Sequence, residues 1–134
     1  MVVNDLIEAV PTAERRRFAS GEAGWVELRP ERDRVRVRCG GAMEISAAEE
    51  LRQECEGLFD RGFERVILDL SHVVSLSPAA VGAIATVNHV ARGLGVRFSV
   101  VPGGGNIAAT LRRAGLLGQL QLEGPTEVFL DWSR

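Results

Sequence analysis

A short apolar run at residues 66–70 (VILDL) places the strongest limit on how this chain folds. It comes shortly after a segment with helical spacing at 46–62. A nearly continuous apolar strand that follows a helix is typical of the centre of a parallel sheet, where both faces of the strand are covered. The run therefore predicts an α/β fold in which helices pack on a mixed, mainly parallel sheet.

Residues 46–62 are the clearest helix in the sequence. Ser46 and Glu49 have the spacing of a capping box, in which each side chain bonds a free backbone N–H of the first turn. Gly62 is expected to end the helix in a left-handed conformation. Cys55 belongs to the apolar face and is expected to be inert packing. That face contains Ala48, Leu51, Cys55, Leu58 and Phe59.

A second helix is expected to begin at Pro78. Proline is favoured at the first helical position, and Ser77 before it is a good N-cap. Gly93 is expected to end this helix, whose inner face contains Val81, Ile84, Ala85 and Asn88. The later elements are a strand at 97–101, a glycine-rich loop at 102–105, a helix capped by Asn106 and ended by Gly115, a short strand at 120–122 and a terminal helix at 126–132.

The N-terminal part of the chain divides into an extension and a hairpin. Residues 1–20 predict an extension of one or two short helical pieces broken at Pro11. Its three arginines, 15–17, are interpreted as a solvated helix face. Strands are expected at 25–28 and 34–38, and the second alternates Val with Arg as a half-exposed strand does. The main domain is therefore placed at residues 21–134.

Composition excludes several classes of function. The chain has 134 residues, enough for one domain, and a net charge of −2 with no lysine, so it lacks the basic surface of a nucleic-acid binder. No apolar run is long enough to span a membrane, and residues 1–10 do not form a secretory signal. Two cysteines sixteen positions apart fit neither a disulfide framework nor a zinc site. These features predict a soluble, cytoplasmic protein.

Residues 70–122 contain no acidic residue and only four arginines: Arg92, Arg97, Arg112 and Arg113. Buried strands explain part of this. The other explanation is a face that binds a partner, because the cores of interfaces are depleted in charge.

Motifs for catalysis and for cofactors are weak. The loop at 102–105 lacks the Lys-Ser/Thr of a Walker motif, and Ala108 stands where a dinucleotide fingerprint has its third glycine. Neither His72 nor His89 has a second ligand at metal spacing. No serine lies in a nucleophile motif and no carboxylates are paired for acid–base chemistry. We therefore expect no enzymatic activity, no metal and no cofactor.

Several motifs together resemble the STAS domain, the family of anti-sigma-factor antagonists and sulphate-transporter tails. Residues 66–73 (VILDLSHV) resemble the family's Asp-Leu-Ser-x-Val, and residues 41–44 (GAME) its Gly-x-Leu-Asp. Residues 111–116 resemble its Leu-x-x-x-Gly-Leu. The resemblance covers roughly residues 24–132 and implies the STAS fold.

The chain departs from the family at its regulatory signature. In the family, Asp-Ser-Ser-Gly opens the second helix and its second serine is phosphorylated by an anti-sigma-factor kinase. Here the tetrad is Ser77-Pro78-Ala79-Ala80, so the acceptor position is Ala79, which has no hydroxyl. Ser77 and Ser75 are the remaining candidates for phosphorylation, although Ser77 is better explained as the N-cap.

The resemblance implies a module that binds a protein partner, with three candidate functions. In the first, Ser75, Ser77, Pro78, Ala79, Ala80 and Val81, together with the loop after Val101, bind an anti-sigma factor of kinase-like ATPase fold and release a sigma factor. In the second, the same helix start contacts the ATPase of a bacterial lipid-trafficking ABC transporter. In the third, the glycine loop and Arg112 or Arg113 sense a small anion or nucleotide. Partner identity and oligomeric state stay open at this level.

Overall fold

The computed structural model describes residues 14–17 and 24–123, and in them six strands form one sheet. Their order in the sheet is their order in the sequence. The first three strands pair antiparallel and the last four pair parallel, so the predicted mixed, mainly parallel sheet is confirmed. The strands are β1 (Glu14–Arg17), β2 (Trp25–Glu31), β3 (Arg34–Met43), β4 (Arg65–Leu76), β5 (Arg97–Val101) and β6 (Gln121–Leu122).

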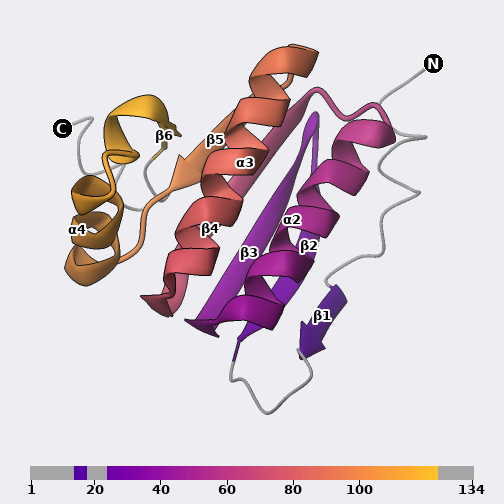
Figure 1. The fold of residues 1–134 in the computed structure, drawn as a ribbon. Coiled ribbons are helices and arrows are strands. Elements are labelled where there is room, and N and C mark those ends of the chain that lie inside the picture. Colours follow the sequence, from indigo (N-terminus) through magenta and orange to yellow (C-terminus); the bar gives the residue numbers. More distant parts are fainter. Residues whose placement is uncertain (1–13, 18–23, 124–134) are drawn as a thin grey trace, which may run out of the picture.

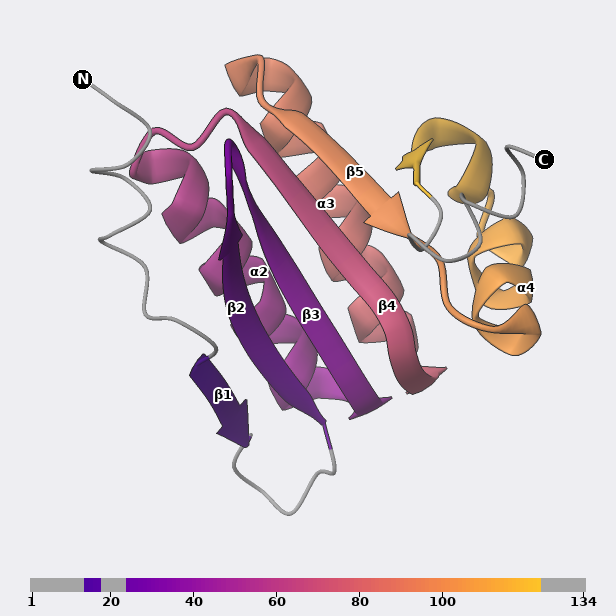
Figure 2. The same cartoon turned by 180° about the vertical axis from the view of Figure 1, so that it is seen from behind.

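Two helices cover one face of the sheet. α2 (Ile45–Asp60) joins β3 to β4, and α3 (Pro78–Leu94) joins β4 to β5. They lie side by side in Figure 1, whereas Figure 2 shows the strands from behind with no described helix over them. α4 (Gly105–Arg113) and the short 3₁₀ helix η1 (Leu117–Gln119) lie beyond β5. The described part of the chain is therefore a two-layer α/β domain.

Alternation along the strands builds the core between these layers. On β3, Val35 and Val37 point to the helices and are fully buried, whereas the arginines between them point to the other face. On β4, Leu68 and Leu70 also point to the helices, α2 and α3, and are fully buried. A fully buried aliphatic side chain contributes about 1.5–3 kcal/mol. Packing between α2, α3 and the sheet therefore dominates the stability of the fold.

Both cysteines belong to this core. Cys39 of β3 and Cys55 of α2 are fully buried and reduced. Burial raises the pKa of each thiol above its ordinary value, because a thiolate is poorly solvated in an apolar interior. The prediction that Cys55 is a packing residue is confirmed.

A ladder of ion pairs crosses the opposite face of the sheet. Arg38 Nη1 lies 2.9 Å from Glu27 Oε1, and Arg36 lies 2.8 Å from Glu31 and 3.4 Å from Asp69. These side chains are at least half-buried although no described helix covers them. The strand at 66–70 is therefore buried on both faces as predicted, but its second face is closed partly by charged neighbours.

The helix ends differ from the sequence predictions at three places. α2 begins at Ile45 with Glu44 as its N-cap, because the chain turns into the helix as soon as β3 ends. Ser46 is already helical, so the predicted capping box with Glu49 is wrong. Gly62 does take a left-handed φ of 95°, as predicted.

α3 runs past Gly93 and ends at Leu94, and Gly95, with a φ of 75°, supplies the left-handed cap instead. The cap predicted for Asn106 is also wrong, because α4 has Gly104 as its N-cap. Asn106 Nδ2 donates instead to the carbonyl oxygen of Val74, at 2.9 Å. Gly115, with a φ of 72°, follows α4 as predicted.

The predictions for the ends of the chain have different outcomes. Residues 14–17 were expected to be helical but form β1, which pairs antiparallel with β2. The prediction of a solvated helix face is therefore wrong, since β2 offers a strand edge that these residues pair with. The rest of the predicted extension and the predicted helix at 126–132 lie outside the described residues.

Candidate functional site

The start of α3 is fixed by the strands beneath it. β3 and β4 end together, with Met43 opposite Leu76. The backbone N–H of Ser77 donates to the carbonyl of Met43 at 3.0 Å, and its Oγ accepts a hydrogen bond from the N–H of Ala80 at 3.1 Å. Pro78 occupies the first helical position. The predicted N-cap and helix start are confirmed, and the Ser77 hydroxyl is committed to capping.

The six residues predicted for the site are not equally accessible. Ser75, Pro78 and Ala79 are exposed, and Ser77 and Val81 are half-buried. Ala80 has no exposed surface, because its side chain faces the sheet. A partner that binds here therefore contacts Ser75, Pro78 and Ala79, and Ala80 serves the core.

Two exposed hydrophobic residues extend the predicted site. Ile45, the first residue of α2, is 73% exposed, and Val74, near the end of β4, is 67% exposed. Both elements reach the end of the sheet where α3 begins. Ile45, Val74, Pro78 and Ala79 together form what we call the α3-start patch. Sequence reasoning missed Ile45 and Val74, although each stands outside the inward periodicity of its element.

The loop between β5 and α4 lies beside this patch. The hydrogen bond from Asn106 to Val74 fastens it to the end of β4. Gly103 has room for no side chain, since an added Cβ would lie 2.7 Å from the carbonyl oxygen of Leu70. Close packing of the backbone thus explains Gly103, whereas a Cβ added at Gly105 would meet nothing within 4 Å. The loop therefore lies next to the end of β4, which leads into α3, and its contact with a partner stays a prediction.

Arg112 and Arg113 do not join this loop. They occupy the last turn of α4, whereas the glycines lie at its start. Arg112 comes six positions after Asn106 along the helix, which is about 9 Å of rise. The residues assigned to an anion sensor are therefore not brought together.

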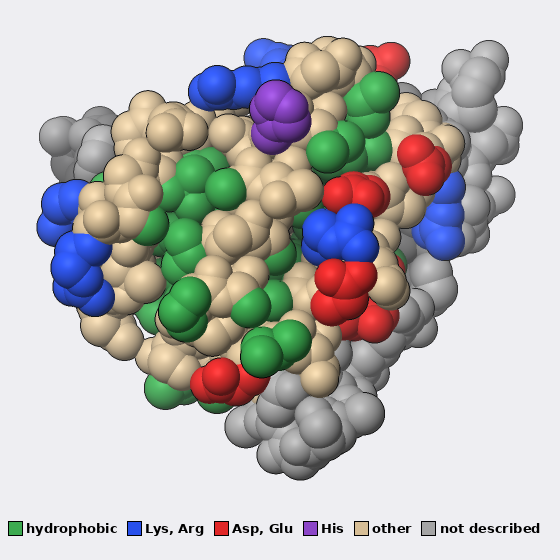
Figure 3. Space-filling model, in the orientation of Figure 1, with side chains coloured by type: hydrophobic (Ala, Val, Ile, Leu, Met, Phe, Trp, Pro, Cys, Tyr) green, Lys and Arg blue, Asp and Glu red, His purple; other side chains and the backbone are tan. Residues whose placement is uncertain are grey.

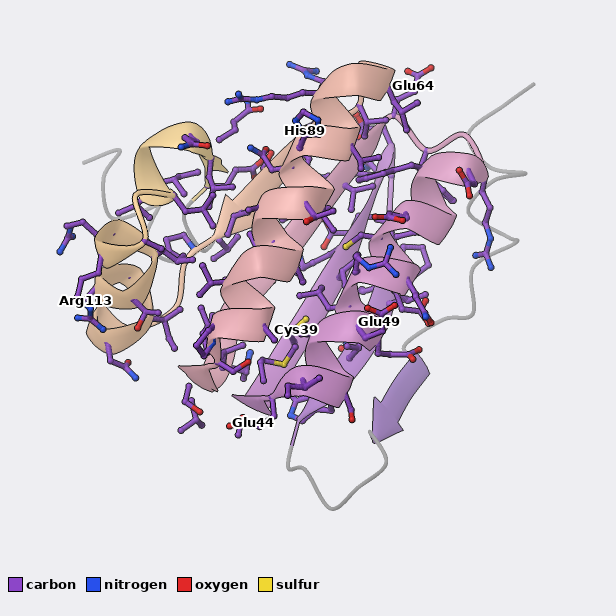
Figure 4. All side chains as sticks on the ribbon, viewed as in Figure 1. Cys39, Glu44, Glu49, Glu64, His89 and Arg113 are labelled. Carbon is purple, nitrogen blue, oxygen red and sulfur yellow. The ribbon has the colours of Figure 1, made fainter. Side chains whose placement is uncertain are left out.

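The electrostatics of the patch combine a helix dipole with one carboxylate. The first turn of α3 contains no acidic residue, so its partial positive charge is unopposed there. Glu44 is exposed and lies at the same end of the molecule, as Figure 4 shows. A bound partner would therefore meet small apolar side chains with a carboxylate beside them.

The described residues contain no group of three or more metal-ligating side chains. Of the two histidines, His89 lies on the exposed side of α3, and His72 contacts Arg38 and Ser71 at 3.4 Å and 3.2 Å on the sheet. Among the helices described, none is both long and apolar enough to cross a membrane.

The fold and the exposed helix start define a mixed α/β domain with a candidate protein-binding end. A family model described as "Mlab, STAS domain" matches residues 26–128. This chain therefore belongs to the STAS domain family. No curated protein matches the chain at a significant level.

Solved structures share this fold at low sequence identity. An anti-sigma factor antagonist from Mycobacterium paratuberculosis superposes with a TM-score of 0.72 at 18% identity, over 84% of this chain and 95% of that one. The Bacillus cell fate determinant SpoIIAA, in its phosphorylated form, gives 0.61 at 16% identity, over 81% and 99%. The murine anion transporter Slc26a9 gives 0.60 at 14% identity, over 98% of this chain but 24% of the transporter. The STAS fold implied by the sequence is confirmed.

Proposed function

We propose that this protein is a non-enzymatic module that binds another protein through the start of α3. The observation that carries the proposal is the α3-start patch, in which Ile45, Val74, Pro78 and Ala79 are exposed at the end of the sheet where α3 begins. Apolar surface gathered in this way is typical of interaction sites, whose centres are also poor in charge. Ser75 and the loop after Val101 border the same surface.

The first candidate partner is an anti-sigma factor of kinase-like ATPase fold in the bacterial cytoplasm. The STAS family membership and the superposition on an anti-sigma factor antagonist support this choice. Binding would withdraw the anti-sigma factor and release a sigma factor for transcription, which is partner switching. Because Ala79 stands at the family's acceptor position, binding would not be switched off by phosphorylation there.

The second candidate partner is the ATPase subunit of a bacterial ABC transporter of the lipid-trafficking type. The family model that matches is the one described as Mlab, and a transporter is among the structures with the same fold. The same patch would hold the ATPase, so both candidates use one site.

The two remaining serines, Ser75 and Ser77, differ in how available their hydroxyl groups are to a kinase. Ser75 is exposed, so a kinase could reach its hydroxyl. The Ser77 hydroxyl caps α3, and a phosphate there would displace the bond to the Ala80 N–H. Ser75 is therefore the better candidate acceptor of the two.

Affinity capture from native lysate tests the site and identifies the partner. Wild type is compared with Ala79→Arg, and Ala114→Arg serves as a control because Ala114 is an exposed alanine at the end of α4. We expect Ala79→Arg to lose the partner and Ala114→Arg to keep it, since an unpaired charge in an interface core is costly.

A captured kinase-like anti-sigma factor supports the first partner, and an ABC ATPase the second. Equal recovery by both variants would overturn the assignment of the site. Intact mass of the recovered bait shows whether a serine carries phosphate.

A further inference from the structure

The helical face of the molecule separates its charges by sign. Residues 44–61, which comprise α2 and its caps, contain six acidic residues and two arginines, a net charge of −4. Residues 102–122, which include α4, contain Arg112 and Arg113 and no acid. Figure 1 places α3 between these two helices. Figure 3 shows acidic side chains gathered on the α2 side, with basic ones among them, and basic side chains at the α4 edge.

The strip between the two charged sides is α3, and its outer surface is uncharged over most of its length. Ala79, Gly82, Thr86 and His89 are exposed there, and the first charged residue of the helix is Arg92 in the last turn. A Cβ added at Gly82 would meet nothing within 4 Å. Glycine within a helix costs about 1 kcal/mol relative to alanine, and the described structure gives no internal reason for it here.

A second copy of the same face has complementary charges. When two such faces meet about a two-fold axis that runs along α3, left and right are exchanged. The acidic α2 of each copy then lies opposite the basic α4 of the other, and α3 packs on α3, so that Gly82 lies opposite Gly82 of the second copy. A two-fold axis across α3 would instead place α2 on α2, where like charges repel.

We propose that this protein forms a symmetric homodimer through its helical face, with the two-fold axis along α3. The charge pattern favours a second copy as the partner and this direction of the axis, and Gly82 allows close approach of the two α3 helices. The proposal needs only this chain and does not rest on the identity of another partner. Because the dimer would cover Ala79, self-association would compete with the binding proposed above.

Sedimentation velocity of the full chain over a range of concentrations tests dimerisation directly. We expect a reversible monomer–dimer equilibrium that weakens as salt is added, since exposed charges at the interface are screened. A chain that stays monomeric at the highest concentration in low salt would overturn the proposal.

Charge reversal tests the face and the axis. Arg112→Glu with Arg113→Glu places acid opposite acid, and Glu49→Arg with Asp60→Arg places base opposite base. Each pair of substitutions should weaken dimerisation on the order of tenfold or more. Arg32→Glu, in the exposed β2–β3 turn, is the control for a change of charge outside the face and should leave the dimer intact.

The four reversals combined in one chain give the sharpest result. They return the net charge to the wild-type value of −2, and they again set opposite charges against each other across the proposed axis. We expect the dimer to be restored. If it is not restored while the chain stays folded, or if neither reversal weakens it, this geometry is wrong.

Gly82→Arg tests the contact between the two α3 helices. The space around Gly82 is open within one copy, and arginine has a better helix propensity than glycine, so the monomer should unfold at the wild-type midpoint or above it. Two arginines would meet at the axis, so the dimer should be lost. A Gly82→Arg dimer as tight as wild type would contradict contact through α3.

Discussion

The start of α3 and the face of the sheet opposite the helices both carry exposed or half-exposed groups, but only on the sheet are these groups paired within the described chain. On the sheet, Arg36 and Arg38 are bonded to carboxylates of neighbouring strands, so the polar groups are satisfied within the chain. At the start of α3, Ile45 and Val74 expose apolar surface that nothing in the described chain covers. A satisfied surface needs no partner, whereas an apolar one gains free energy when it is covered. Because of this difference, we assign binding to the start of α3.

The largest expected change in the free energy of unfolding distinguishes two adjacent residues at the start of α3. Ala80→Arg forces a charge into the core, where Ala80 has no exposed surface, and should lower the free energy of unfolding by about 3–5 kcal/mol. Ala79→Arg, one position away on the exposed side, should change it by about 0.5 kcal/mol or less. Urea unfolding measures both. Equal midpoints would mean that the burial of Ala80 is wrong.

The ion-pair ladder should give the next largest effect. Glu27 is buried and pairs with Arg38 at 2.9 Å and Arg29 at 3.3 Å. Glu27→Ala should cost about 1–3 kcal/mol, because it leaves the half-buried Arg38 guanidinium without its carboxylate. Glu31→Ala should cost less, since Arg36 keeps Asp69.

Captured partners should be unchanged in both ladder variants when they remain folded. Loss of partner binding in Glu27→Ala without loss of stability would move the site to the sheet face.

A smaller effect is expected at the cap of α3. Ser77→Ala removes the acceptor of the Ala80 N–H and should cost about 1 kcal/mol, whereas Ser77→Asp should retain most of the stability. Ser75→Ala, at an exposed position before the helix, should be close to neutral. Thermal unfolding of the three variants distinguishes them. A Ser75→Ala chain less stable than Ser77→Ala would contradict the capping role.

The smallest effect belongs to an exposed ion pair at the end of the ladder. Arg65 Nη1 lies 3.1 Å from Asp33 Oδ2, and this hydrogen bond lowers the pKa of Asp33. A carboxyl whose pKa is lowered by folding stabilises the protein above its unfolded pKa, and this contribution is lost as pH falls through the folded pKa. Asp33→Asn should therefore flatten the acid side of the stability profile slightly. High salt should remove the difference between the two chains.

Much of the architecture could be predicted because it depends on local pattern. The apolar run at 66–70, the proline at position 78 with its serine cap, and Gly62 each report a backbone preference that short sequences carry. The predicted capping box at Ser46 was wrong because the end of β3 decides where α2 begins. The prediction of a helix at residues 14–17 was wrong because pairing with β2 outweighs the weak helical preference of these residues.

Within the candidate site, the family motif located the helix start and the missing hydroxyl at Ala79. It did not separate Ala79 from Ala80, because two small residues in a row give no sign of which one faces the sheet. Ile45 and Val74 join them only when the ends of two strands and the starts of two helices meet.

The sequence by itself determined the α/β class, the STAS family and the absence of an acceptor hydroxyl at position 79, since these depend on residue identity and local periodicity. Only the tertiary structure decided which residues of the helix start are exposed, which charges are paired across the sheet, and that acidic α2 and basic α4 lie on either side of α3. Those properties depend on contacts between segments distant in the chain. Such contacts follow from how the whole core packs, and no single segment encodes them.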